Sequence, residues 1–217
     1  MIEDMYEEKN PLGYFDNIRM DVISFIDKPA GEVLEIGCGA GGTLSYLKSN
    51  GLAQHVVGID IASSQIEAAL RQGVDEAFVS NLDDLEEILH GRTFDAILML
   101  DVLEHLVDPW SVLKRISGFL RPGGRAYVSL PNVQSVRVLV PLLMGQWRYK
   151  ELGILDKTHL RFFTKRTAVE LLRGAGFELE SVHHKLESHA LPRLINFLTL
   201  GVFKRYLTVQ YILVGRI

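Results

Sequence analysis

Three glycines and an aspartate stand at the ends of two short apolar runs in the first third of the chain. Gly37, Gly39 and Gly42 follow the run 32–36 with the spacing GxGxxG, and Asp60 ends the next run, 55–60. A glycine loop between a strand and a helix, with an acidic residue about 20 positions further on, is typical of nucleotide-cofactor sites. Because glycine lacks a Cβ, the backbone of such a loop can approach its ligand closely. The pattern predicts cofactor binding at Gly37, Gly39 and Asp60.

Glu35 puts a carboxylate between Leu34 and Ile36, where a buried parallel strand would be apolar throughout. Burying a charge without a partner costs free energy or shifts its pKa. Glu35 would also repel the pyrophosphate of a nicotinamide or flavin dinucleotide. S-adenosylmethionine (SAM), in contrast, has no phosphate and carries an ammonium and a sulfonium group, which a carboxylate attracts. Glu35 therefore favours SAM as the cofactor and leaves a nicotinamide oxidoreductase as the remote alternative.

The elements that position these residues follow from the alternation of short apolar runs with helix-like stretches, which predicts βαβ units and a parallel sheet. Strands are predicted over 32–36, 55–60, 76–80, 94–100, 124–130, 177–184 and 207–215. Helices are predicted over 42–50, 63–73, 83–91, 108–120 and 164–177. Asp108 and Thr164 are the expected N-caps of the last two helices.

Four motifs occur in order over residues 30–132: "VLEIGCGAGG", "VVGID", "FDAILMLDVLEHLVDP" and "LRPGGRAYVSLPN". They resemble the successive motifs of class I SAM-dependent methyltransferases. The tail, with "AGFELESV" and a last apolar strand, is similar to that fold too. The resemblance implies an α/β fold of the Rossmann-like methyltransferase type, with a doubly wound, seven-stranded, mostly parallel sheet whose last strand is antiparallel. Length and composition make a single domain over residues 1–217 the default.

The resemblance gives roles to residues at the ends of the second and third strands. Asp60 should accept hydrogen bonds from both ribose hydroxyls, and Ile61 should pack on the adenine. Asn81 and Leu82 follow the third strand, where the family often has an acidic residue. The amide oxygen of Asn81 would then accept the adenine amino proton, and a surface turn is the equal alternative.

Further cofactor contacts are expected at Leu100 and Asp101, where similar enzymes line the methyl-transfer channel. An amphipathic helix is predicted over residues 13–27 and could cover the cofactor. Tyr14 and Arg19 lie where similar enzymes use an aromatic ring and a cation to close over SAM, and Arg19 could pair with the methionine carboxylate. A solvated arginine on a packing helix explains Arg19 equally well. Cys38 lies inside the glycine loop and is expected to contribute to cofactor binding, while its side chain is expected to pack rather than react.

Methyl transfer from a sulfonium is an in-line displacement, so the protein must mostly align donor and acceptor. A hydroxyl acceptor also needs to lose a proton, and a neutral imidazole suits this task. His105 and His159 are the candidate catalytic residues. His105 could equally be a packing residue, and His159 could simply bind local backbone. No Cys/His cluster has metal-ligand spacing, so no metal site is predicted.

Two segments exceed the common core and should determine acceptor specificity. Residues 133–163 are too long for a simple connection and are expected to build the acceptor pocket. Within them, the stretch that begins "LDKTHLRFF" resembles a subgroup that modifies bacterial glycans or small polar and quinone-like acceptors. Residues 187–204 are apolar and could cap the pocket, form a dimer face or lie on a membrane, with Lys204 and Arg205 toward the headgroups.

Composition limits the classes of function. The chain has 217 residues and a net charge of −4, so it lacks the basic field that nucleic-acid binding needs. A single cysteine excludes an internal disulfide, and the acidic N-terminus does not resemble a signal peptide, so a cytoplasmic protein is expected.

The leading hypothesis is a SAM-dependent methyltransferase that modifies a hydroxyl of a small or glycan-type acceptor and releases S-adenosylhomocysteine. A quinone-precursor methyltransferase, an N-methyltransferase and a SAM-binding protein without catalysis are the alternatives.

Overall fold

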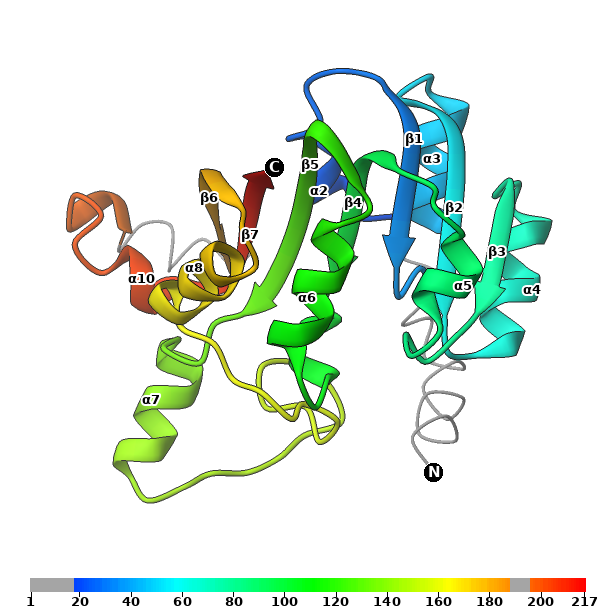
Figure 1. Cartoon of the computed structure of the whole chain (residues 1–217). Helices are drawn as coiled ribbons and strands as arrows, with labels where there is room; N and C mark the ends of the chain where they lie inside the picture. The colour runs from blue at the N-terminus through cyan, green and yellow to red at the C-terminus, as the bar shows by residue number, and fades with distance from the viewer. Residues whose placement is uncertain (1–17, 188–195) are drawn as a thin grey trace. The chain divides into compact units, whose positions relative to one another are not determined.

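A seven-stranded sheet organises the residues that this computed structural model describes, which are 18–187 and 196–217. The strand order is β3-β2-β1-β4-β5-β7-β6, and the sheet is mostly parallel with an antiparallel last strand (Figure 1). The strands are β1 (Ala30–Ile36), β2 (Ala53–Asp60), β3 (Glu76–Val79), β4 (Phe94–Leu100), β5 (Leu120–Pro131), β6 (Glu178–Leu186) and β7 (Thr208–Arg216). The doubly wound order, with β1 between β2 and β4, confirms the predicted fold class.

Each predicted helical stretch contains a helix, whereas two further helices, over 136–143 and 204–207, were not predicted. They are α2 (Met20–Ile23), α3 (Gly42–Ser49), α4 (Ser63–Arg71), α5 (Leu85–Leu89), the 3-10 turn η2 (Leu103–His105), α6 (Pro109–Ser117), α7 (Val136–Leu143), α8 (Lys165–Gly174) and α10 (Lys204–Leu207). Thr164 is the N-cap of α8 and forms a capping box with Thr167. Asp108 precedes α6 and its Oδ1 accepts a hydrogen bond from Ser111 N at 3.1 Å. Both predicted N-caps are therefore confirmed.

The predicted N-terminal helix differs from what is observed. Of residues 13–27, only the last part is described, and it contains the four-residue helix α2. Val22 and Ile23 of α2 are buried, whereas Ile18, which the amphipathic pattern places on the same stripe, is exposed. The expected stripe thus holds for the described turn of helix and not for Ile18.

The described residues form two compact units. The first contains the described residues up to Leu100 together with Arg115–Tyr127 and Arg216–Ile217. In it, β1 pairs in parallel with β2 and β4, and β2 pairs in parallel with β3. Helices α3 and α4 pack against β2 and β3 (Figure 1). The fully buried side chains of Leu34, Ile36 and Ile59 hold the ends of β1 and β2 in this core.

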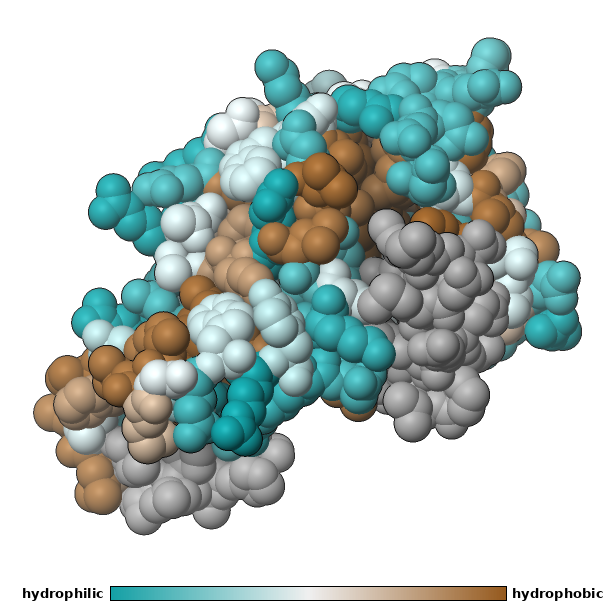
Figure 2. Space-filling view, turned by 90° about the horizontal axis from the view of Figure 1, so that it is seen from below, coloured by the Kyte–Doolittle hydropathy of each residue, from teal (hydrophilic) through white to brown (hydrophobic). Residues whose placement is uncertain are grey.

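The second unit contains the described parts of Asp101–Lys114 and Val128–Gly215. Helices α8 and α10 pack on β6. Its surface includes large apolar side chains that are exposed, in and after α7 and over 197–203: Val136, Val140, Leu142, Leu143, Met144, Phe197, Leu198, Leu200, Val202 and Phe203. Figure 2 shows hydrophobic surface at the lower left of the face that it presents and again above its centre. Of the predicted apolar segment 187–204, residues 188–195 lie outside the described part of the chain.

No helix among the described residues combines the length and the hydropathy that a membrane span requires.

Candidate functional site

The glycine loop after β1 is fastened to the end of β2. The backbone N of Gly37 donates to the carbonyl of Ile59 at 2.7 Å, and Gly39 N donates to Asp60 Oδ2 at 2.8 Å. Gly37 and Gly39 have φ values of 70° and 51°, in the left-handed region that side chains other than glycine rarely adopt. The glycines therefore permit the turn that brings this loop onto Asp60.

Asp60 is the last residue of β2, and its carboxylate is buried. Its Oδ1 accepts a hydrogen bond from Ala62 N at 3.0 Å, while Oδ2 accepts the bond from Gly39. Each carboxylate oxygen has two lone pairs, so a carboxylate that accepts backbone hydrogen bonds can also accept from a diol such as that of ribose. Ile61 follows directly and is partly accessible, as a side chain that packs on a ligand must be. These ligand contacts of Asp60 and Ile61 stay predictions.

Glu35 is only 3% exposed, near the end of β1. Burial raises the pKa of its carboxyl to about 8, the nearby Arg19 opposes that rise, and Asp60 adds to it. Glu35 Oε2 makes no hydrogen bond within the part of the chain that the structure describes. A buried carboxyl oxygen in need of a partner fits a cationic ligand such as the ammonium group of SAM.

Arg19 is held beside the start of α3. Its backbone N donates to Thr43 Oγ1 at 3.2 Å, and its guanidinium pairs with Asp21, with Nε 3.0 Å from Oδ1. The guanidinium is close enough to Glu35 to lower the pKa of that carboxyl. Thr43 is a contact that sequence reasoning missed, since a threonine within a helix carries no signal of its own. Tyr14, the aromatic partner predicted for Arg19, lies outside the described residues.

The thiol of Cys38 is buried against Gly58 of β2. A Cβ on Gly58 would lie 2.7 Å from Cys38 Sγ, so only glycine leaves room for this side chain. Burial raises the pKa of the Cys38 thiol well above its ordinary value, and the charges of Asp60 and Glu35 add to the rise. The thiol is thus a packing group, and only the backbone of Cys38 is left to serve the predicted cofactor contact.

Asn81 and Leu82 form a turn after β3. Asn81 Oδ1 accepts a hydrogen bond from Asp83 N at 3.0 Å, and Asn81 Nδ2 donates to Asp83 Oδ2 at 3.0 Å. Leu82 is buried with a φ of 74°, and its N donates to Ser80 Oγ. The hydrogen bonds with Asp83 thus explain the turn at Asn81. The contact of Asn81 with adenine stays a prediction.

Leu100 ends β4 as a buried residue, and Asp101 follows it with a φ of 60°, a conformation that aspartate tolerates better than most residues. Asp101 Oδ1 accepts hydrogen bonds from Ser129 Oγ, at 3.1 Å, and from Gln210 Nε2. Ser129 lies in β5 and Gln210 in β7. The sequence motifs predict only Asp101. Its hydrogen-bond partners lie in strands whose sequences contain no motif that marks them as part of a polar site.

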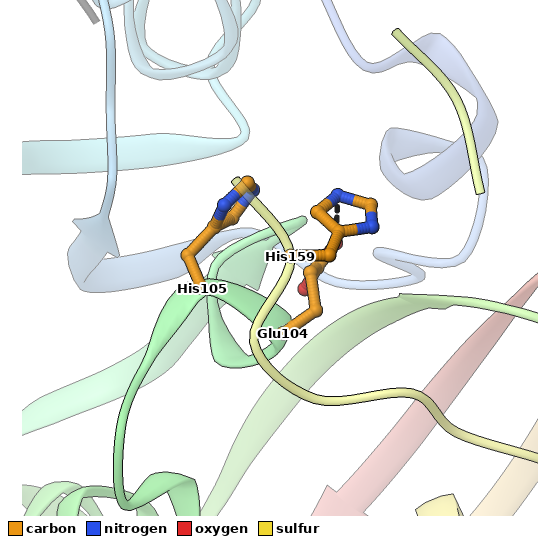
Figure 3. A group of neighbouring side chains, drawn as sticks. All are labelled: Glu104, His105 and His159. Atoms are coloured by element: carbon orange, nitrogen blue, oxygen red, sulfur yellow. Dashed lines mark ion pairs between the residues drawn. The ribbon is translucent and has the colours of Figure 1, made fainter. Parts of the chain in front are cut away.

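In the second unit, Glu104, His105 and His159 come together from two segments (Figure 3). Glu104 is 1% exposed and His159 7% exposed, and His159 Nε2 lies 3.9 Å from Glu104 Oε1. The two imidazole rings meet edge to face, with their centroids 4.7 Å apart. Both histidines were predicted as catalytic residues. Sequence reasoning missed that they converge with Glu104.

The segment that contains the cofactor motifs matches a known protein family. Residues 6–182 match a family model described as a methyltransferase domain. The chain belongs to this methyltransferase family. A ubiquinone biosynthesis O-methyltransferase of Aeromonas salmonicida (strain A449) is 30% identical over 192 residues, which cover 83% of this chain and 79% of the relative. The protein of the same name from Xanthomonas axonopodis pv. citri (strain 306) is 29% identical and covers 80% and 74% of the two chains.

Solved methyltransferase structures share the fold. A SAM-dependent methyltransferase from Archaeoglobus fulgidus matches with a TM-score of 0.65 at 18% identity, over 98% of this chain and 92% of the other. The plantazolicin methyltransferase BpumL, in complex with S-adenosylhomocysteine, matches with a TM-score of 0.67 at 16% identity, over 99% and 93%. With the family membership and the loop geometry, the protein is a SAM-dependent methyltransferase.

Proposed function

We propose that this methyltransferase transfers the methyl group of SAM to a hydroxyl of a small hydroxylated aromatic acceptor of the quinone-precursor type. Two relatives that match about four fifths of the chain are named ubiquinone biosynthesis O-methyltransferases. Their names favour the quinone-precursor alternative of the sequence analysis over a glycan acceptor. An aromatic hydroxyl also loses its proton more readily than a sugar hydroxyl does, which makes its oxygen a better nucleophile at neutral pH.

The observation that carries this proposal is the cluster of Glu104, His105 and His159, in which Glu104 and His159 are buried. Oxygen methylation requires removal of a proton from the acceptor, and imidazole and carboxylate groups are the side chains that most often assist this step. Burying polar side chains costs free energy unless hydrogen bonds or ion pairs compensate for it, so their gathering at buried positions favours a functional role. We therefore assign to His159 and His105 the handling of the acceptor hydroxyl.

Aromatic side chains next to His159 suit an aromatic acceptor. The Phe162 ring lies 6.4 Å from the His159 ring, and Trp147 lies edge to face with Phe162 at 5.4 Å. Rings at these distances favour stacked or edge-to-face packing, which a benzene ring can extend. Residue Trp147 belongs to the predicted acceptor segment 133–163, so this aromatic group supports that role for the segment.

The test is turnover against a panel of acceptors with SAM, followed by the release of S-adenosylhomocysteine and by mass spectrometry of the product. The panel contains ortho-dihydroxybenzenes with and without an alkyl tail, their fully O-methylated analogues as matched controls, free sugars and aromatic amines. We expect methylation of the dihydroxybenzenes alone. Methylation of sugars or amines instead would overturn the acceptor class. Binding of S-adenosylhomocysteine without turnover on any acceptor would favour a SAM-binding protein.

A further inference from the structure

Asp101 adopts a backbone conformation that is uncommon for a residue with a side chain. It follows the last residue of β4 directly, and its φ is 60°, in the left-handed region. Residues other than glycine hold this conformation at a cost in free energy, so it persists where surrounding contacts enforce it, and such residues cluster at active sites. The groups that bind Asp101 are therefore candidates for a functional role of their own.

Two side chains from the neighbouring strands hold the Asp101 carboxylate. In the sheet, β4 lies beside β5, and β5 lies beside β7. Asp101 Oδ1 accepts hydrogen bonds from Ser129 Oγ of β5, at 3.1 Å, and from Gln210 Nε2 of β7. The backbone N of Asp101 also donates to the Ser129 carbonyl at 3.3 Å. Main-chain and side-chain hydrogen bonds together thus fix the direction of this carboxylate.

The network lies at the edge of the sheet where ligands are expected to bind. The strand order reverses between β1 and β4, and open α/β sheets bind ligands outside the carboxyl ends of their strands at such a point. Asp101 is the first residue beyond the carboxyl end of β4. Ser129 is fully buried, whereas Asp101 and Gln210 are partly accessible. The network is therefore anchored in the core and includes a carboxylate that a ligand can reach.

Gln210 and Ser129 orient the Asp101 carboxylate without neutralising it. Both side chains are uncharged, so neither hydrogen bond places a positive charge beside Asp101, as an arginine or lysine donor would. The amide of Gln210 directly precedes residues 211–214 of β7, all of which are buried and hold this part of the strand in the core. A carboxylate that accepts two hydrogen bonds on one oxygen can accept others from a ligand. The arrangement thus suits a carboxylate that binds a hydroxyl group.

We propose that Gln210 is a positioning residue for methyl transfer, and that it acts by holding the Asp101 carboxylate against a hydroxyl of the acceptor. This assignment rests on the proposed function, with an aromatic acceptor that has two adjacent hydroxyls. His159 and His105 handle the hydroxyl that loses its proton, and Asp101 accepts a hydrogen bond from the hydroxyl next to it. Fixing the second hydroxyl aligns the first with the methyl group, and a misplacement of about 1 Å can cost about 10²-fold in rate.

Kinetics of Gln210 variants test this role with the purified full chain, SAM and an ortho-dihydroxybenzene. Gln210→Met keeps the length of the side chain and removes the amide donor. We expect kcat/KM for the acceptor to fall by about 10- to 100-fold, while affinity for S-adenosylhomocysteine stays within about twofold. Gln54→Met makes the same substitution at an exposed position of β2 and should leave turnover unchanged. Wild-type turnover by Gln210→Met would overturn the proposal.

Gln210→Glu adds a measurement that a purely structural role would not change. Near pH 8 the introduced carboxylate repels Asp101 and cannot donate a hydrogen bond, so turnover should fall below that of Gln210→Met. As the pH falls toward about 5.5, the introduced carboxyl takes up a proton, because a like charge beside it raises its pKa, and it can then donate to Asp101. Turnover relative to the wild type at the same pH should therefore rise. A constant ratio across this range would contradict the positioning role.

A double-variant cycle shows whether Gln210 acts through Asp101. Asp101→Gly removes the carboxylate and leaves a residue that adopts the left-handed conformation freely. If Gln210 works by orienting that carboxylate, Gln210→Met should cause no further loss of rate when it is added to Asp101→Gly. Equal losses in both backgrounds would show that Gln210 acts elsewhere.

Thermal unfolding and S-adenosylhomocysteine affinity check that each variant is folded. Gln210→Leu, which also lacks the donor, replaces Gln210→Met if that variant does not fold. Methylation of a sugar or an amine by the wild type would overturn the proposed acceptor class alone, and the same cycle measured on that acceptor would still decide the role of Gln210.

Discussion

The carboxylate of Asp60 accepts a hydrogen bond from the backbone N–H of Gly39, at 2.8 Å, and thereby ties the end of β2 to the loop that follows β1. A second backbone N–H, that of Ala62, binds the other carboxylate oxygen. The residue predicted to hold the ribose thus also shapes the loop that must approach the cofactor. Loss of Asp60 should weaken cofactor binding in two ways. It removes the carboxylate that accepts the ribose hydrogen bonds, and it releases the glycine loop from the end of β2.

Asp60→Ala should therefore weaken S-adenosylhomocysteine binding by at least about 1.5 kcal/mol, roughly tenfold, because charge-assisted hydrogen bonds are the strong ones. Isothermal titration calorimetry measures this change. The matched control is Asp75→Ala. Its carboxylate also accepts a backbone hydrogen bond from β2, from Val56 N at 3.0 Å, but Asp75 lies just before β3, whereas Asp60 lies at the end of β2. The control should lower thermal stability and leave affinity unchanged. Equal affinity in the Asp60 variant would remove Asp60 from the cofactor site.

Glu35 makes a prediction about pH. Its pKa is raised from 4.5 to about 8 by burial, so the folded protein retains a proton that the unfolded chain releases. A carboxyl of this kind contributes stability that is fully present below the unfolded pKa and is lost as pH rises toward the folded pKa. Between about pH 5 and pH 8, the free energy of unfolding of the free protein should fall relative to that of Glu35→Gln.

The cofactor reverses this preference, because a cationic ligand favours the ionised carboxylate. Binding of SAM near pH 7 should release a proton from the wild type and none from Glu35→Gln, as titrations in buffers with different ionisation enthalpies can measure. SAM affinity should also be lower in the variant. Equal proton release by both proteins would mean that Glu35 does not face the cation.

Gly58 and Cys38 should show coupled effects on stability. A methyl group on Gly58 would lie 2.7 Å from Cys38 Sγ, so Gly58→Ala must push the glycine loop away from β2. Overpacking of this kind typically costs about 1–3 kcal/mol of unfolding free energy. Cys38→Ala removes the obstructing sulfur, so the double variant should regain most of that loss. Denaturant unfolding of the four proteins gives the coupling, and strictly additive effects would show that the two residues do not meet.

The sequence predicts best those features that depend on neighbouring residues. Apolar runs predict the last residues of β1 and β2 and place their starts within two residues, and Thr164 predicts the start of α8, because strand burial and helix capping are local effects. The four motifs likewise place the glycine loop and Asp60. Glu35 attracts notice for the same reason, since a carboxylate in an apolar run is conspicuous.

Contacts between distant segments are not predictable in this way. Gln210 reaches Asp101 from β7, and the sequence of β7 gives no reason to prefer that glutamine. The convergence of Glu104 with His159 depends on the path of residues 133–163, which have no periodicity to fix it. Motif searches work within one segment, so they miss a cluster that joins a turn after β4 to a loop before α8.

His159 gives the last prediction. Its Nδ1 lies 3.1 Å from the carbonyl of Ile154 and its Nε2 lies 3.9 Å from Glu104 Oε1, and we expect the ring to serve the acceptor rather than the cofactor. Assistance to proton removal typically contributes a factor of about 10² to 10⁴ in rate, so His159→Ala should lower turnover by that order. Affinity for S-adenosylhomocysteine should stay within about twofold, because no interaction with the cofactor is removed.

The role of His159 is isolated by comparison with variants of two other histidines. His105→Ala should also lower turnover, and the double variant should be little worse than either alone, since residues that act as a unit are not additive. His184→Ala is the matched control: its Nδ1 binds Thr208 at 2.9 Å, and burial with nearby lysines lowers its pKa to about 4, so its loss should affect stability rather than rate. Full turnover by His159→Ala would reduce this histidine to a packing residue, and loss of cofactor affinity would move it to the SAM site.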